Sequence, residues 1–167
     1  EIFFTKKEKE FSSQIMNQIK NKIGGKKLVL IEPYVKLTRG YQNRDWGFNK
    51  WQKVVDKLTG EVEFIHLTFG DRVALNNVIN LHGVNYRSAV AILSKCDLFL
   101  GTESGLHHAA AATSVKGVVI FGGWNSPKIT GYDLHDNIYI DSEESPCGSK
   151  ITCKHCQRCM ELITPKL

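Results

Sequence analysis

The chain has 167 residues, 42% of them hydrophobic and 23% charged, which suits one soluble globular domain with a real core. The net charge of +5 comes with dispersed lysines, which favours solvated helix faces over a nucleic-acid-binding surface. No apolar run approaches the ~20 residues that cross a bilayer, and EIFFTKKEKEF has too short an apolar part for a signal peptide, so we expect a cytoplasmic protein.

Strand-like and helix-like patterns alternate along the chain. Thr5 and Glu8 have the spacing of a capping box and predict a helix over residues 5–22 that stops at Gly24 and Gly25. Short segments rich in Val, Ile and Leu predict strands at 26–33, 62–70, 78–81, 97–101, 116–123 and 137–141. Further helices are predicted at 48–58, 85–96, 103–114 and 155–164, with a polar loop at 34–46 and a short helical turn at 71–77.

This alternation predicts the fold class, which is an α/β domain built on a doubly wound parallel sheet with helices on both faces. Ligands of such sheets bind beyond the carboxyl ends of the strands. The loops that follow strands are therefore where we expect a binding site, and they are residues 33–47, 68–72, 101–105 and 122–128.

The stretch FLGTESGLHHAAAA, residues 99–112, runs from a strand through a glycine-bearing turn into an alanine-rich helix. A helix that begins near Ser104 leaves its first backbone N–H groups unpaired, and these groups and the helix dipole favour an anion. Gly105 lets a phosphate approach the backbone, because it has no Cβ. The alternative is an ordinary helix start, with Thr102 or Ser104 as the cap and Glu103 complementing the dipole.

Arg44 follows the first predicted strand, within YQNRDWGFNKW, and so lies at the same end of the sheet as Gly105. Its planar guanidinium suits phosphate oxygens, and the alternative is a solvated loop cation. Asp71, in the FGDR loop, is either a ribose contact or a helix N-cap. The sequence contains neither a Walker loop nor the dinucleotide G-x-G-x-x-G motif.

Four of the five cysteines crowd near the C-terminus with the spacing C-x5-C-x2-C-x2-C, and they are Cys147, Cys153, Cys156 and Cys159. Four thiolates can hold Zn or Fe in a structural site, and His155 could replace one of them. Free thiols and disulfides are the alternatives, and a reducing compartment disfavours disulfides. The fifth, Cys96, is expected to be a small buried residue.

Together these segments resemble the ADP-heptose–lipopolysaccharide heptosyltransferase family, glycosyltransferase family nine. The stretch ESGLHHAAA resembles the family's acid-[ST]-G-x-x-H-x-A-A motif, with Glu103 as the acid, Gly105 as the glycine and His108 as the histidine. NRDW resembles an N-K-x-W-like loop of the family, with Arg44 where lysine is usual. VVIFGGWNSP and the cysteine-rich tail with CMELIT are also similar, so the resemblance covers roughly residues 26–164.

The resemblance implies one half of a GT-B fold, in which two Rossmann-like domains face each other across a cleft. Residues 1–25 would be a helix that comes from a missing N-terminal domain, and residues 26–144 the nucleotide-sugar-binding Rossmann-like domain. Residues 145–167 would be a cysteine-rich tail with a C-terminal helix.

The implied function is transfer of a heptose-like sugar from a nucleoside diphosphate sugar, such as ADP-heptose, to a glycan or lipopolysaccharide-type acceptor. Arg44 and the backbone amides of Ser104 and Gly105 would hold the diphosphate. Glu103 would orient sugar hydroxyls, and His108 would support the loop or reach the phosphate. Together with Thr102 and Asp71, these residues are the expected catalytic and nucleotide-binding set.

The acceptor site and the general base would belong to the missing domain, and the enzyme would work in the cytoplasm, with peripheral contact to the inner membrane. No catalytic metal is expected, because DSE at residues 141–143 is a poor substitute for an Asp-x-Asp motif. A sugar-nucleotide epimerase of GT-B type is the alternative enzyme. A non-catalytic nucleotide- or glycan-binding module is the alternative outside enzymes.

Overall fold

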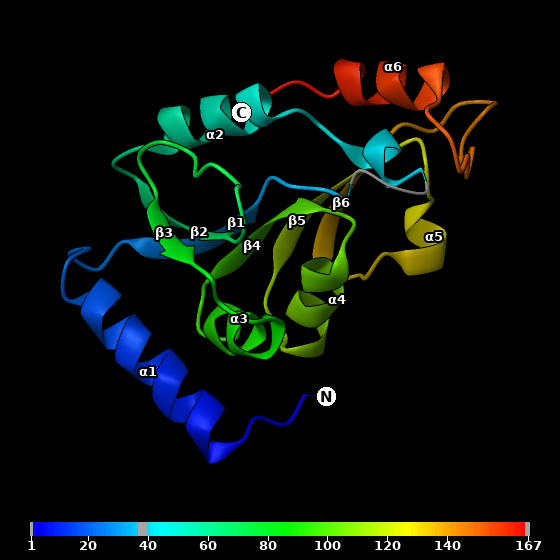
Figure 1. Cartoon of the computed structure of the whole chain (residues 1–167). Helices are drawn as coiled ribbons and strands as arrows, with labels where there is room; N and C mark the ends of the chain where they lie inside the picture. The colour runs from blue at the N-terminus through cyan, green and yellow to red at the C-terminus, as the bar shows by residue number, and fades with distance from the viewer. Residues whose placement is uncertain (1, 37–39, 166–167) are drawn as a thin grey trace.

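The computed structural model describes residues 2–36 and 40–165, whose strands form one six-stranded parallel sheet in the order β3-β2-β1-β4-β5-β6 (Figure 1). The strands are β1 (Lys27–Glu32), β2 (Val62–Thr68), β3 (Ile79–His82), β4 (Leu98–Thr102), β5 (Gly117–Gly122) and β6 (His135–Tyr139). The chain builds outward from β1 to β3 and then from β4 to β6 in the other direction. This order confirms the predicted doubly wound sheet.

Helices cover both faces of the sheet, as predicted. In Figure 1, α1 (Lys6–Lys20), α3 (Tyr86–Leu93) and α4 (Gly105–Ala112) lie below it, whereas α2 (Phe48–Leu58) and α6 (Lys154–Leu162) lie above it. Two short helices follow strands, and they are the 3-10 helix η1 (Tyr41–Arg44) and α5 (Pro127–Thr130). Among the residues that the structure describes, no helix combines the length and the apolar sequence that a bilayer crossing requires.

The central strand β1 shows why the strands are apolar without alternation. Leu28 and Leu30 pack into the core between the sheet and the helices α1, α3 and α4. Val29 and Ile31 pack into the core between the sheet and α2. Successive side chains of a strand point to opposite faces, so a strand covered on both sides must be apolar at every position.

The N-terminal helix follows its sequence signals closely. Thr5 and Glu8 form the predicted capping box, and Gly24 and Gly25 both have positive φ where the chain leaves the helix. Met16, Ile19 and Ile23 are buried in the same core as α3, so this helix is packed as part of the sheet domain.

Some predicted elements were wrong. The polar loop contains η1, residues 71–77 form turns and extended chain without a helix, and the last strand begins two residues earlier than predicted, at His135. The prediction did not include α5. Residues 1, 37–39 and 166–167, which fall in the predicted N-terminal segment, the 33–47 loop and the cysteine-rich tail, lie outside the described residues.

Substituting alanine for Phe99, which is 0% exposed in the core of β4, should destabilise the protein by about 3–5 kcal/mol because it leaves a cavity. Denaturant unfolding of the variant measures this loss. Phe3→Ala is the matched control, since Phe3 is 79% exposed, and it should change stability by no more than about 0.5 kcal/mol. Equal effects of the two variants would show that the core is assigned wrongly.

Candidate functional site

A cavity of about 540 Å³ opens at the carboxyl ends of β1 and β4, the two strands between which the direction of chain building reverses. All four loops predicted from the sequence contribute lining residues, including Arg44, Arg72, Ser104 and Trp124. The volume is within the range of small-molecule sites. We call this cavity the switch-point pocket.

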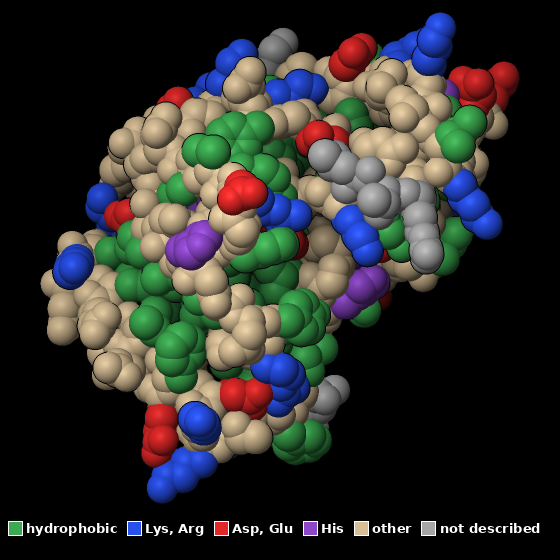
Figure 2. Space-filling view, in the orientation of Figure 1, with side chains coloured by type: hydrophobic (Ala, Val, Ile, Leu, Met, Phe, Trp, Pro, Cys, Tyr) green, Lys and Arg blue, Asp and Glu red, His purple; other side chains and the backbone are tan. Residues whose placement is uncertain are grey.

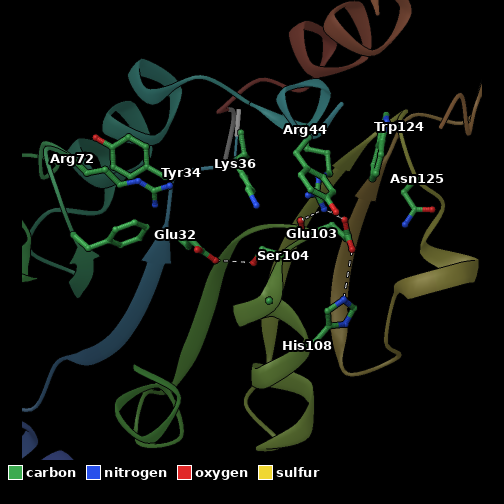
Figure 3. A pocket seen from close by; sticks show the side chains of 14 residues that line it. Glu32, Tyr34, Lys36, Arg44, Arg72, Glu103, Ser104, His108, Trp124 and Asn125 are labelled. Carbon is green, nitrogen blue, oxygen red and sulfur yellow. Dashed lines mark hydrogen bonds and ion pairs between the residues drawn. The ribbon is translucent and has the colours of Figure 1, made fainter. Parts of the chain in front are cut away.

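Charged side chains concentrate in the switch-point pocket. Lys36, Arg44 and Arg72 bring positive charge, and Glu32 and Glu103 bring carboxylates. Figure 2 shows acidic and basic side chains and a histidine around a hollow on this face, and Figure 3 shows the labelled side chains converging from several strand ends. The combination can recognise an anionic ligand that also carries hydroxyl groups.

Arg44 is buried and paired, so the alternative of a solvated loop cation was wrong. It is 8% exposed, and its Nη1 donates to the carboxylate and to the backbone carbonyl of Glu103 (Figure 3). Its guanidinium lies 4.4 Å from the ring centre of Tyr41 and 4.9 Å from that of Trp124. Burial lowers the pKa of Arg44 to about 10, so the side chain is charged at pH 7.

Glu103 links Arg44 to His108. The carboxylate is 6% exposed, and its Oε1 lies 3.6 Å from His108 Nε2, while His108 Nδ1 lies 3.0 Å from the hydroxyl of Tyr132. Burial, with a smaller effect of Arg44, lowers the pKa of His108, so the ring is neutral at pH 7. His108 thus contacts Glu103 and borders the pocket at once.

The start of α4 faces the pocket as the sequence predicts. Ser104 is the N-cap, its hydroxyl accepting from the backbone N–H of His107 at 3.3 Å and donating to Glu32 Oε2 at 2.7 Å. Gly105 opens the helix and lines the pocket, where the first backbone N–H groups lack intrahelical acceptors. Thr102, the other predicted cap, is fully buried in β4 and does not line the pocket.

Three charged residues of the pocket were missed by sequence reasoning. Glu32 ends β1, Lys36 follows β1 and Arg72 follows β2, so all three stand at or after strand ends, which was the available signal. Burial raises the pKa of Glu32, although Ser104, Arg72 and Arg44 act against this shift. The guanidinium of Arg72 lies over the rings of Phe69 and Tyr34, at 4.1 and 4.7 Å from their centres.

Asp71, the expected ribose contact, is exposed and is not among the residues that line the pocket. Its alternative role as a helix N-cap fails because no helix begins there. The neighbouring Arg72 lines the pocket instead. From the sequence alone, nothing distinguishes which of two adjacent loop residues turns inward.

The cysteine-rich tail forms a compact cluster of possible ligands. Cys147, Cys153, His155 and Cys156 offer ligand atoms that all lie within 4.8 Å of one another. His155 Nδ1 is buried with no hydrogen-bond partner among the described residues, as expected of an atom available to a metal. Cys159 lies outside this group, with its Sγ 3.2 Å from His155 Nε2, so His155 stands where the sequence led us to expect Cys159. No disulfide joins any of the five cysteines.

Comparison with known proteins identifies the family of this chain. The model of glycosyltransferase family 9 (heptosyltransferase) matches residues 4–159. A search of curated proteins gave no match.

Several solved structures share the fold, and three of them are described here. E. coli ADP-heptose LPS heptosyltransferase II is 17% identical, with a TM-score of 0.64 over 96% of this chain and 51% of that chain. The iron-containing dodecameric glycosyltransferase TibC from enterotoxigenic E. coli H10407 is 17% identical, with a TM-score of 0.63 over 84% and 42%. E. coli heptosyltransferase WaaC with ADP is 13% identical, with a TM-score of 0.57 over 84% and 45%. This chain therefore spans about half the length of the solved structures that it matches.

His107, next to the motif histidine, is fully buried and does not line the pocket. Neither ring nitrogen has a hydrogen-bond partner among the described residues, and the rings of His108, Tyr132 and His135 surround it at centre distances of 4.7, 5.2 and 5.1 Å. Burial is the main reason why its pKa is lowered to about 3, with smaller effects of His108, His135 and Arg44. The histidine is therefore held neutral in the folded protein.

We expect His107 to make the protein less stable in acid. An unfolded histidine binds a proton near pH 6.5, whereas folded His107 does so only near pH 3, so stability falls as the pH drops between these values. His107→Phe should reduce the slope of unfolding free energy against pH in this range by up to about 1.4 kcal/mol per pH unit. An unchanged slope in His107→Phe would refute the assignment.

Proposed function

This chain belongs to glycosyltransferase family 9, the heptosyltransferase family, and we propose that it is the half of such an enzyme that binds the nucleotide-sugar donor. The observation that carries the proposal is that Arg44 and the start of α4 face one cavity at the switch point of the sheet. Two of the similar structures support the class of ligand, since one is WaaC with ADP and another is TibC with ADP-D-β-D-heptose.

We assign the diphosphate of the donor to the part of the pocket that is lined by cationic side chains and by the start of α4. The backbone N–H groups at Gly105 and the dipole of α4 favour an anion at the helix start. Arg44 uses Nη1 for Glu103 and has further N–H groups for phosphate oxygens, and Lys36 and Arg72 line the same cavity.

The carboxylates are the proposed ligands of hydroxyl groups. Glu103 holds Arg44 through Oε2, and its other oxygen remains for a sugar hydroxyl beside His108. Glu32 lies between the helix start and Arg72, within reach of the same ligand. These positions support a sugar or ribose next to the diphosphate.

In the proposed reaction the bond between the anomeric carbon and the diphosphate oxygen breaks, and the acceptor oxygen bonds to that carbon. The bonding electron pair leaves with the diphosphate, where negative charge grows. Fixed cations and backbone dipoles that meet this charge lower the barrier. The proton of the acceptor hydroxyl passes to a base that we assign to the other half of the enzyme, together with the acceptor site.

The acceptor is proposed to be a glycan or lipopolysaccharide-type molecule, in line with the heptosyltransferase family. A lipid-linked acceptor would bring the complete enzyme to the inner face of the membrane from the cytoplasm. The alternative of an epimerase requires free acid and base carboxylates. Glu103 is paired with Arg44 and Glu32 accepts from Ser104, which favours transfer over epimerisation.

Arg44→Ala should weaken binding of ADP by about tenfold to a hundredfold, because a charge-assisted hydrogen bond contributes about 1.5–3 kcal/mol. Titration calorimetry with ADP, and with GDP, UDP and CDP to identify the base, measures the change. Arg87→Ala is the matched control, since Arg87 pairs with Glu8 on the surface, away from the pocket. If Arg44→Ala binds ADP as tightly as Arg87→Ala does, Arg44 is not part of the site.

We propose in addition that the cysteine cluster holds a structural metal, Zn or Fe. Thiolate and imidazole donors suit both metals, and three thiols with one histidine match a closed four-ligand site. The name of TibC, an iron-containing glycosyltransferase, supports iron as one candidate. When bound, such a metal would cross-link the residues of the tail, and it would take no part in the reaction.

Metal analysis of the purified protein should find about one equivalent of Zn or Fe, since structural sites bind tightly. Cys156→Ser should lose that metal and lower the melting temperature. Cys96→Ser is the control and should keep the metal. Cys96 is buried in the core between the sheet and the helices α1 and α3, outside the cluster. Less than about a tenth of an equivalent in the unmodified protein would reject the site.

A further inference from the structure

The segment that carries the first two cysteines, residues 147–153, packs directly against the loop after β5, and we call it the cysteine loop. The backbone N–H of Cys147 donates to the carbonyl of Gly123 at 3.1 Å, and that of Gly148 to the carbonyl of Trp124 at 3.0 Å. The indole N–H of Trp124 in turn donates to the carbonyl of Ser149 at 2.8 Å. Trp124 lines the switch-point pocket, so the cysteine loop holds part of the pocket in place.

Asn43 attaches the cysteine loop to η1 on the other side. Its side chain is 1% exposed, and its Nδ2 donates to the carbonyls of Ser149 and Ile151 at 3.2 and 2.8 Å. Its Oδ1 accepts from the backbone N–H of Cys153 at 2.9 Å. Both the nitrogen and the oxygen of this side-chain amide are thus hydrogen-bonded to the backbone of the cysteine loop. The next residue in the chain is Arg44.

The glycines at these contacts show how closely the segments approach. A Cβ on Gly40, which has a φ of +82°, would lie 2.2 Å from the carbonyl oxygen of Ser149. A Cβ on Gly123 would lie 2.5 Å from the Sγ of Cys159. The backbone at Gly40 therefore meets the backbone of the cysteine loop, and the backbone at Gly123 meets the side chain of Cys159 in the tail. Because there is no spare space at Gly40, a shift of the cysteine loop toward η1 must move η1.

Arg44 is the last residue of η1, the first of these two attached segments, and its side chain contacts the second. Its guanidinium lies near the rings of both Tyr41 in η1 and Trp124 after β5, whose centres are 5.9 Å apart, and both segments are bonded to the cysteine loop. We propose that the cysteine loop positions Arg44 for the donor diphosphate, with Asn43 as the positioning residue. Metal binding at the cluster and diphosphate binding in the pocket would then strengthen each other by the same factor. This inference rests on the proposed function, because it concerns affinity for the donor.

A double-mutant cycle tests the route through Asn43. The affinity for ADP is measured by calorimetry on metal-loaded wild type, Asn43→Ala, Arg44→Ala and the double variant. We expect Asn43→Ala to weaken ADP binding about tenfold and to add little once Arg44 is already alanine. Gln52→Ala is the matched control, since Gln52 also holds a loop by bonds to the backbone N–H and carbonyl of Asn76, and it should bind ADP like wild type.

A second measurement follows the metal instead of the nucleotide. In wild type, ADP should raise the affinity for the metal, measured by equilibrium competition with a chelator, and this increase should be absent in Asn43→Ala. Where Asn43→Ala does not fold, ADP binding to chelator-stripped wild type, checked by circular dichroism to be folded, should be about tenfold weaker than to the metal-loaded form.

The outcomes separate the two ideas. Wild type that binds no nucleoside diphosphate overturns the proposed function. Wild type that binds ADP, with Asn43→Ala binding equally well or with the loss undiminished in the Arg44→Ala background, overturns the positioning role alone. For a variant that does not fold, equal binding by stripped and loaded wild type overturns it.

Discussion

The buried pair of Arg44 and Glu103 is the interaction on which the arrangement of the site depends. It joins η1 to the end of β4, two segments that are far apart in the sequence. A guanidinium as buried as this one would be costly without an opposite charge, and removing one partner of such a pair typically costs about 3–5 kcal/mol. Glu103 therefore has a structural role, which is to hold Arg44, in addition to its proposed role of binding a sugar hydroxyl.

The position of the pocket follows from the topology of the sheet. Because β1 and β4 are neighbours while their connections leave in opposite directions, the loops that follow them separate and leave a crevice. The start of α4 and three cationic side chains face this crevice together with two carboxylates. Burial raises the pKa of one of these carboxyl groups, that of Glu32, because desolvation disfavours its charged form.

The tail after β6 reinforces the same end of the molecule. It packs along η1 and the loop after β5, and α6 returns over the sheet beside α2 (Figure 1). The indole of Trp46 donates to the carbonyl of Ile163 at 2.8 Å, which ties the end of the tail to the start of α2. The cysteine-rich segment and the pocket are thus one packed unit, although the sequence separates them.

The fold class, the helix start at Ser104 and the loops that line the pocket could be predicted from the sequence, because strand alternation, caps and glycines are local signals that tertiary packing preserved. The sequence did not determine that Arg44 is buried, that Asp71 turns outward while Arg72 turns inward, or that His155 joins the cysteines in place of Cys159. The extra elements η1 and α5 were also missed, since each is a single short turn without a period of its own. These features depend on which distant segments meet, and the free energy of burying a charge or a ligand atom is decided by those neighbours alone.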